Sequence, residues 1–230
     1  MNRIRNKMSV ALKSFLGVER SIVSIAPDLI MDVRHNDIFG KALLKNQVPE
    51  QEVTECLLDS IQPGMTILDI GANIGYMTLI CSRAAGSNGQ VISFEPNPIM
   101  VRELKHNLEL NGIRNVLIEP VALGENQGTL CLMLPEAGKE SHSSLCTNST
   151  FQAVGEISVS VESLDSVIAR LSLKKIDLIK IDVEGAELMV FRGAEKVLRE
   201  MRPLIVFESA ENLAEAFGHS VFDVLTFVAS

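Results

Sequence analysis

Short apolar runs bounded by turn residues recur through the middle of the chain, and stretches with helical spacing of apolar positions separate them. Such runs are typical of strands that are buried on both faces of a parallel sheet. The runs are residues 66–70, 90–94 and 115–119, and the helical stretches are residues 76–85 and 97–112. The order strand, helix, strand, helix, strand predicts a doubly wound α/β fold with a mostly parallel sheet.

The segments on either side of this unit follow a different pattern. Before it, the sequence predicts short strands at residues 22–25 and 29–33 and a helix at residues 49–61. After it, residues 129–134 and 156–161 predict an antiparallel β excursion, which a polar loop at residues 138–149 interrupts. The remainder predicts a helix, a strand, a helix, a strand and a last helix, at residues 163–173, 176–181, 186–200, 203–207 and 213–228.

This pattern divides the chain into two parts of unequal size. Residues 1–48 form an N-terminal cap with a basic helix and short strands, and residues 49–230 form the main domain. A sheet of this kind commonly continues with a further strand pair after its last helix. We therefore expect either that this terminal strand pair is missing beyond Ser230, or that residues 203–207 form an exposed edge strand at which a homodimer could pair.

Composition narrows the classes of protein. The chain has 230 residues, of which 47% are hydrophobic, enough for one folded domain with an appendage. A net charge of −8, a single Tyr and the lack of Trp argue against nucleic-acid binding. The four cysteines lack metal-ligand spacing, which indicates free thiols and a cytoplasmic location. No apolar run approaches the roughly 20 residues that span a bilayer.

Residues 1–20 carry several basic side chains, and their apolar positions have helical spacing. This pattern predicts a basic amphipathic helix. Its simplest role is to pack on the domain or to cover a cleft. Contact with an anionic membrane surface is the alternative.

The turn after residues 66–70 carries the densest chemical signal, with the pattern Asp69-x-Gly71-x-Asn73-x-Gly75. A strand, a glycine loop and a helix in this order present free backbone N–H groups to a ligand. A carboxylate at Asp69 would repel a pyrophosphate, but it favours a ligand with an amino group and a sulfonium, such as S-adenosylmethionine. Glu95 ends the next strand, where an acidic side chain can accept hydrogen bonds from both ribose hydroxyls.

Three segments together resemble the FkbM family of methyltransferases. They are residues 68–75 (LDIGANIG), 94–97 (FEPN) and 181–187 (IDVEGAE), and the similarity runs in the same order from about residue 36 to Glu208. The resemblance implies a class I, Rossmann-like fold and dependence on S-adenosylmethionine, with S-adenosylhomocysteine as the product. It also implies mainly O-methylation, of substrates that include sugars and polyketide macrolides.

Carried over by position, the resemblance implies a cofactor site. The methionine part would contact the glycine loop, Glu95 would bind the ribose, and residues 121–123 would contact the adenine. The expected cofactor-binding residues are Asp69, Gly71, Asn73, Gly75, Tyr76, Thr78, Glu95, Val121, Ala122 and Leu123. The loop at residues 138–149, where the choice of acceptor should lie, matches nothing in the family.

Methyl transfer to oxygen needs a group that aligns the acceptor and takes its proton. Asp182 ends the fourth core strand and should face the crevice at the carboxyl edge of the sheet, and Glu184 follows it. We expect one of the two to act as base or to orient the acceptor, and Glu187 to be structural. The alternative is that all three acids cap the next helix. His142, in the polar loop, is a further candidate base.

A metal site is the last chemical candidate. Some O-methyltransferases hold a divalent cation between acids after the fourth and fifth strands, and Asp182, Glu208 and Asn212 could approximate that set. Glu208 more simply caps the end of its strand, and we predict no metal.

The sequence thus predicts a methyltransferase that uses S-adenosylmethionine and acts on a small hydroxylated acceptor, a sugar or a secondary metabolite. Two alternatives stay open at this point. One is a nucleotide-binding oxidoreductase on the same fold, against which Asp69 argues. The other is a non-catalytic binding module that docks through its N-terminal helix. N-methylation also stays open, because an acid can assist both reactions.

Overall fold

The structure is a computed structural model that describes residues 19–35, 38–45, 49–134 and 155–229. The loop expected at residues 138–149 lies outside the described residues, as does all but the end of the N-terminal helix expected at residues 1–20. No described helix is both long enough and apolar enough to cross a membrane.

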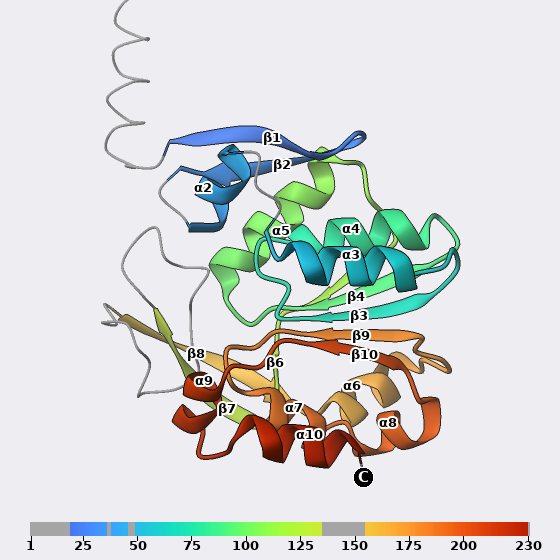
Figure 1. The fold of residues 1–230 in the computed structure, drawn as a ribbon, viewed down its shortest axis with the longest axis vertical. Coiled ribbons are helices and arrows are strands. Elements are labelled where there is room, and N and C mark those ends of the chain that lie inside the picture. Colours follow the sequence, from blue (N-terminus) through green and yellow to red (C-terminus); the bar gives the residue numbers. More distant parts are fainter. Residues whose placement is uncertain (1–18, 36–37, 46–48, 135–154, 230) are drawn as a thin grey trace, which may run out of the picture.

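A five-stranded sheet forms the centre of the molecule (Figure 1). Its order is β10 (Leu204–Phe207), β9 (Leu178–Ile181), β3 (Thr66–Ile70), β4 (Gln90–Phe94) and β5 (Val116–Glu119), and all four pairings are parallel. This arrangement confirms the doubly wound, mostly parallel sheet. Strand β10 lies at one edge of it, where Leu204 is half exposed.

Helices cover both faces of the sheet and bury one apolar cluster against each (Figure 1). One face carries α3 (Gln51–Ser60), α4 (Tyr76–Ala85) and α5 (Pro98–Leu110). The other carries α6 (Leu164–Leu171), α7 (Glu187–Arg192), α8 (Glu195–Met201) and α10 (Val221–Ala229). Asn97 caps α5 as its position before Pro98 suggests, because its side chain accepts a hydrogen bond from the N–H of Ile99.

An antiparallel hairpin, β1 (Arg20–Ala26) and β2 (Leu29–Arg34), packs against α5 and matches the short strands expected there. Helix α2 (Ile38–Leu44) follows, in a stretch for which the sequence pattern predicts no element. The buried side chain of Asn107 in α5 and the half-buried side chain of Asn111, the C-cap residue of α5, bind the backbone of β2. Asn107 accepts from the N–H of Asp32, and Asn111 bonds both backbone groups of Ile30.

The antiparallel excursion is confirmed as a separate three-stranded sheet of β6 (Ala122–Leu123), β8 (Gly155–Glu162) and β7 (Gly128–Leu134). Strands β7 and β8 pair antiparallel, and the short β6 pairs parallel with β8. Residues 121–123, expected to contact adenine, thus begin the excursion at the carboxyl end of β5.

Two helices expected to be continuous are each divided. The stretch 186–200 forms α7 and α8, because Asp165 of α6 accepts hydrogen bonds from the N–H groups of Lys196 and Val197 and so caps a new helix. The break includes Gly193, where an added Cβ would lie 2.0 Å from the carbonyl oxygen of Gly124. The stretch 213–228 forms α9 (Glu211–Ala216) and α10, separated by a turn at Gly218 with φ of 81°.

Candidate active site

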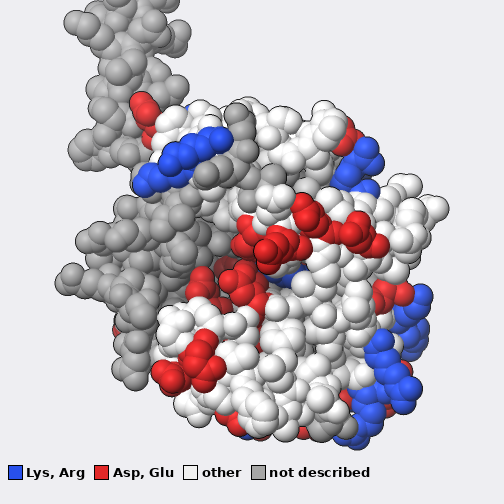
Figure 2. All heavy atoms as spheres, viewed as in Figure 1, with Lys and Arg blue, Asp and Glu red and all other residues white. Residues whose placement is uncertain are grey.

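The carboxyl ends of β3, β4 and β9 meet at a cavity of about 320 Å³. Ligands bind at this edge in open α/β sheets. The wall opposite the sheet comes from the N-terminal segments, through Phe39 and Ala42 of α2 and through Pro49 and Glu50 before α3. In the view of Figure 2, acidic side chains gather near the middle of the molecular surface.

The glycine loop that follows β3 forms one side of the cavity. The N–H groups of Gly71 and Ala72 both donate to the carbonyl oxygen of Phe94, which ties the loop to the end of β4. Gly71 has φ of 83°, and a Cβ there would lie 1.8 Å from the carbonyl oxygen of Asp182. The loop therefore needs glycine at Gly71 to pass so close to the end of β9.

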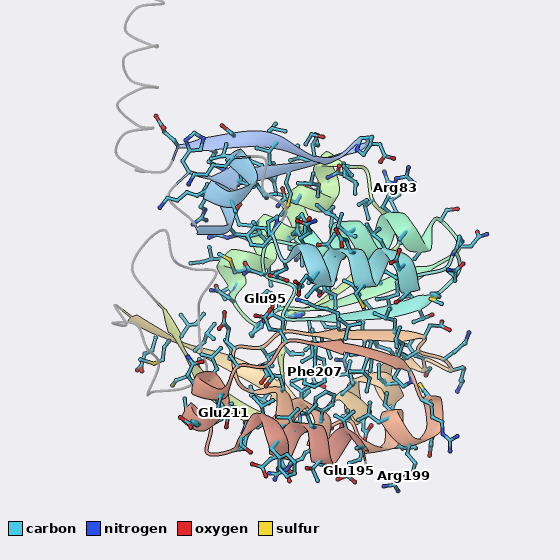
Figure 3. All side chains as sticks on the ribbon, viewed as in Figure 1. Arg83, Glu95, Glu195, Arg199, Phe207 and Glu211 are labelled. Atoms are coloured by element: carbon cyan, nitrogen blue, oxygen red, sulfur yellow. The ribbon has the colours of Figure 1, made fainter. Side chains whose placement is uncertain are left out.

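Glu95 follows β4 and lines the cavity near the centre of the molecule (Figure 3). Its two carboxylate oxygens accept hydrogen bonds from the backbone N–H groups of Asn73 and Asn97, at 2.9 and 2.8 Å. Burial nevertheless raises the pKa of Glu95 to about 7, against the opposing effect of these two bonds. A hydroxyl that donates to this carboxylate would favour its ionised form.

Asp69, in contrast, lies beneath the cavity rather than in its lining. Its side chain is completely buried, accepts a hydrogen bond from the hydroxyl of Thr78, and lies 3.8 Å from Nζ of Lys180. Burial raises the pKa of Asp69, while Lys180 and Thr78 act in the opposite direction. Asp69 and Thr78 therefore do not line the cavity, and they can influence a bound ligand only through the residues around them.

Six of the seven other residues that were expected to bind the cofactor line the cavity. Gly71, Asn73 and Tyr76 line the cavity, and so do Val121, Ala122 and Leu123 on the far side of Glu95. Gly75 is not in the lining; an added Cβ there would lie 2.3 Å from the side chain of Leu104. The ring of Tyr76 meets that of Phe39 edge to face, with 5.3 Å between their centroids.

The candidate catalytic acids separate into two kinds. Asp182 and Glu184 both line the cavity, directly after β9. Glu187 does not line it; its buried carboxylate accepts a hydrogen bond from the N–H of Gly185 within its own turn, which supports the structural role expected for it. His142 lies outside the described residues.

Two side chains at the cavity were not singled out from the sequence. Lys180 lies within β9, and its ammonium donates a hydrogen bond to Oδ2 of Asp182 at 3.3 Å. Glu50 occupies the N-cap position of α3 but makes no side-chain capping bond, and its carboxylate lines the cavity instead. Burial raises the pKa of Glu50 to about 6, with Lys180 opposing and nearby acids adding to the shift.

The backbone is strained where these acids lie. Of the five described non-glycine residues with positive φ, three line the cavity: Glu50, Asn73 and Glu184. Such conformations cost of order 1–3 kcal/mol each and gather at functional sites. Their concentration here supports this cavity as the candidate functional site of the described residues.

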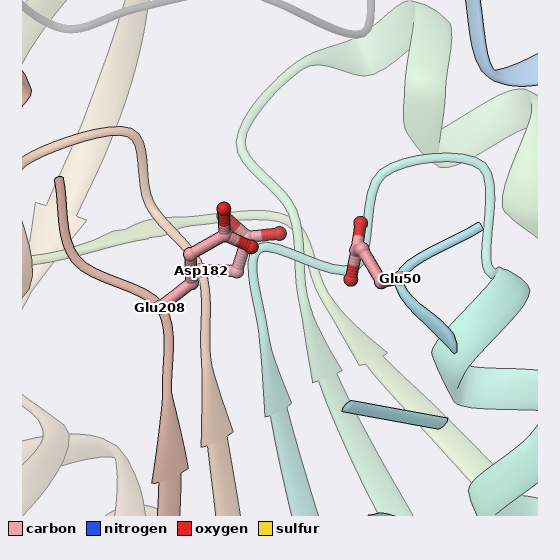
Figure 4. Close-up of side chains that lie close together, drawn as sticks. All are labelled: Glu50, Asp182 and Glu208. Carbon is pink, nitrogen blue, oxygen red and sulfur yellow. The ribbon is translucent and has the colours of Figure 1, made fainter. Parts of the chain in front are cut away.

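Three carboxylates meet at the mouth of the cavity. Oxygen atoms of Glu50, Asp182 and Glu208 all lie within 4.8 Å of one another. Figure 4 shows Asp182 and Glu208 following neighbouring strands, with Glu50 approaching from the segment before α3. The set contains two of the three residues considered for a cation from the sequence, and it adds Glu50.

Comparison with known proteins gives a consistent result. The family model of the methyltransferase FkbM domain matches residues 69–230. The chain is 28% identical over 159 residues to the hexuronic acid methyltransferase AglP of Haloferax volcanii, and 27% identical over 161 residues to the 31-O-demethyl-FK506 methyltransferase FkbM of Streptomyces tacrolimicus. These matches cover 68% and 59% of this chain and 61% of each relative.

A solved structure shares the fold. It is that of a Clostridium thermocellum protein assigned as an rRNA methylase, which is 13% identical, with a TM-score of 0.50 over 78% of each chain. At this identity the likeness concerns the fold alone, and it agrees with the class I, Rossmann-like architecture expected from the sequence.

Proposed function

The chain belongs to the FkbM family of S-adenosylmethionine-dependent methyltransferases, and we propose that it methylates a hydroxyl group of a sugar or a secondary metabolite. The observation that carries the proposal is the meeting of Glu95 and Asp182 on one cavity, from the carboxyl ends of different strands. We assign the carboxylate of Glu95 to the cofactor and that of Asp182 to the acceptor.

The cavity fits S-adenosylmethionine on the cofactor side. Glu95 is a buried carboxylate whose remaining lone pairs suit two ribose hydroxyls. The apolar side chains of Val121 and Leu123 offer a surface for a flat base, and the glycine loop leaves room for the methionine part. We assign these positions to the cofactor, with Asp69 and Thr78 supporting the loop from below.

When bound, S-adenosylmethionine supplies a methyl group on a positively charged sulfur. The residues of this chain then have to hold the acceptor oxygen in line and remove its proton. Asp182 accepts a hydrogen bond from the acceptor hydroxyl and takes up the proton as the oxygen becomes bonded to carbon. Glu184, two residues later along the same wall, orients the rest of the acceptor.

The acceptor is proposed as a hydroxyl compound without a negative charge. Carboxylate oxygens of Glu50, Asp182 and Glu208 lie together at the mouth of the cavity, and they can accept hydrogen bonds from several hydroxyls. The same carboxylates would repel an anionic group. The relative named for hexuronic acid therefore does not set the acceptor class proposed for this chain.

A labelled methyl donor with a panel of hydroxylated acceptors tests the proposal, after calorimetry has established saturable binding of S-adenosylhomocysteine. We expect methylation of a neutral polyol or glycoside. Asp182→Asn should lower kcat by about 100-fold or more, because a positioned base typically contributes 10²–10⁴-fold, with little change in cofactor affinity.

Asp59→Asn is the matched control, because Asp59 is an exposed residue of α3 away from the cavity lining, and its turnover should equal that of the unaltered chain. Unchanged turnover in Asp182→Asn would remove Asp182 from the reaction. Lack of saturable binding of S-adenosylhomocysteine by the folded protein would contradict the cofactor site.

A further inference from the structure

Lys180 is the one basic side chain among the described residues that line the cavity. It lies in β9, whose residues are all buried and whose neighbours in the sheet are β3 and β10. Only 4% of its surface is exposed. A buried ammonium is strongly unfavourable unless it is paired, so a strand of this kind normally carries an apolar residue at this position.

Two carboxylates lie close to this ammonium, and a third attracts it from further away. Asp182 lies two residues along the same strand direction and therefore on the same face of the sheet, and Asp69 is the direct partner of Lys180 across the β3–β9 pairing. The distances from Nζ are 3.3 Å to Oδ2 of Asp182 and 3.8 Å to Oδ1 of Asp69. Glu50 contributes a longer-range attraction.

The two close pairs are not equivalent. Asp69 lies below the cavity and already receives a hydrogen bond from Thr78. The contact of Lys180 with Asp182 is a hydrogen bond, whereas its distance to Asp69 is longer than a hydrogen bond allows. The side chain that Lys180 directly orients is therefore the one that faces the cavity.

We propose that Lys180 is a positioning residue that holds Asp182 by its Oδ2 oxygen, so that the Oδ1 oxygen faces the acceptor hydroxyl. The inference rests on the proposed function and assigns its catalytic carboxylate a dedicated partner. Lys180 also places a positive charge 3.3 Å from Oδ2 of Asp182, beside the carboxylates of Glu50 and Glu208.

A purely structural role for Lys180 would be to neutralise the buried carboxylate of Asp69. The two roles are separated by comparing three variants: Lys180→Met, Asp69→Asn, and the double variant. Removing the ammonium and the Asp69 charge together restores neutrality below the cavity, but it leaves Asp182 without its partner. Melting temperature, affinity for S-adenosylhomocysteine, and kcat and KM at saturating cofactor are measured for each.

We expect Lys180→Met to melt at a lower temperature than the unaltered chain and to lose about 100-fold in kcat, since a misplaced base loses most of its contribution. The double variant should recover the melting temperature of Asp69→Asn. Its kcat should remain at least about tenfold below that of Asp69→Asn, with a smaller change in the KM of the acceptor. Lys180→Arg, which keeps the charge, should regain more than about tenfold of the lost kcat.

Equal kcat in Asp69→Asn and the double variant would overturn the inference, because Lys180 would then serve Asp69 alone. An inactive Lys180→Arg with an unchanged melting temperature would also overturn it. A different result would contradict the proposed function itself. If the unaltered chain bound S-adenosylhomocysteine but methylated no hydroxyl compound, both proposals would be overturned.

Discussion

The fold has two opposing effects on the ionisation of the Glu95 side chain. Two backbone N–H groups stabilise its ionised form, and burial opposes them strongly enough to bring its pKa to about 7. Hydroxyls of a bound ribose would donate to the carboxylate and add to the first effect. Binding of the cofactor should therefore prefer the ionised form.

This preference predicts a pH dependence of cofactor affinity. A group with a pKa of about 7 is roughly one-tenth ionised at pH 6 and nine-tenths ionised at pH 8. The affinity for S-adenosylhomocysteine should thus rise about tenfold between these pH values, as measured by calorimetry. Glu95→Gln, which cannot ionise, should bind more weakly and with a flat profile. An equally steep profile in that variant would assign the titration to another group.

The carboxylates of Glu50, Asp182 and Glu208 are close enough to share a cation, but Lys180 already brings a positive charge to Asp182 and Glu50. A divalent ion among these carboxylates would be repelled by the ammonium. We therefore expect turnover to be unchanged after treatment with EDTA and after addition of Mg²⁺. Loss of turnover in EDTA that Mg²⁺ restores would show that the three acids bind a metal.

At the scale of single residues, prediction from the sequence worked where a motif fixes the position. Asp182 and Glu95 could be placed at the cavity because each directly follows a strand that could be recognised. Lys180 was overlooked because an apolar run with one lysine still predicts a strand. Glu50 lies far along the chain from both acids, and only the tertiary fold brings it to the same cavity.

The glycine loop shows how one element constrains another. Gly71→Ala would place a methyl group on the carbonyl oxygen of Asp182, in a backbone conformation that alanine adopts poorly. The variant should lose about 2–4 kcal/mol in the free energy of unfolding, measured by denaturant titration, and should bind S-adenosylhomocysteine more weakly.

Gly112→Ala is the control for Gly71→Ala. Gly112 also has a positive φ, of 62°, but no atom lies within 4 Å of the added Cβ. This variant reports the conformational term alone, which is about 1–2 kcal/mol. Similar losses in the two variants would mean that the contact with the end of β9 matters little.

Helix α5 links the N-terminal hairpin to the cofactor side of the cavity. The side chain of Asn107 is completely buried and spans the two, with its amide donating to the carbonyl oxygen of Ile74 in the glycine loop and its oxygen accepting from β2. Asn111, one turn later, holds the same strand but has no such bond to the loop.

Asn107→Leu and Asn111→Leu therefore form a matched pair. Each should lose about 1–3 kcal/mol in the free energy of unfolding, because each leaves backbone groups of β2 without a partner. Only Asn107→Leu should weaken the binding of S-adenosylhomocysteine, by about tenfold, since it also releases the glycine loop. Equal affinities in the two variants, measured by calorimetry, would show that the hairpin does not support the loop.

Strands were easier to predict than helices. Strands β3 and β4 have the expected bounds, because turn residues limit each run on both sides. The division between α7 and α8 depends on Asp165 of α6, about thirty residues earlier in the chain, which supplies the cap. A pattern of apolar spacing within one helix contains no information about such a partner.

At the scale of the whole molecule, the net charge and the carboxylates at the cavity should both affect which acceptor binds. The chain has a net charge of −8, and carboxylates stand at the mouth of the cavity. For a matched pair of acceptors, a neutral hexoside and the corresponding hexuronide, kcat/KM should favour the neutral compound by tenfold or more at low salt.

The difference between these two acceptors should shrink when about 0.5 M NaCl screens the field at the mouth of the cavity. A preference for the hexuronide would contradict the acceptor class proposed here.

A homodimer through the edge strand β10 stays a prediction, which sedimentation can test.

The wall that faces the sheet across the cavity comes from Phe39, Ala42, Pro49 and Glu50, all of which precede the segment, residues 69–230, that the family model matches. The two walls of the pocket thus come from separate parts of the chain. A transplant of the segment around α2 between relatives should carry acceptor preference with it and leave affinity for the methyl donor in place. That separation makes this short stretch the natural starting point for redesigning what the enzyme modifies.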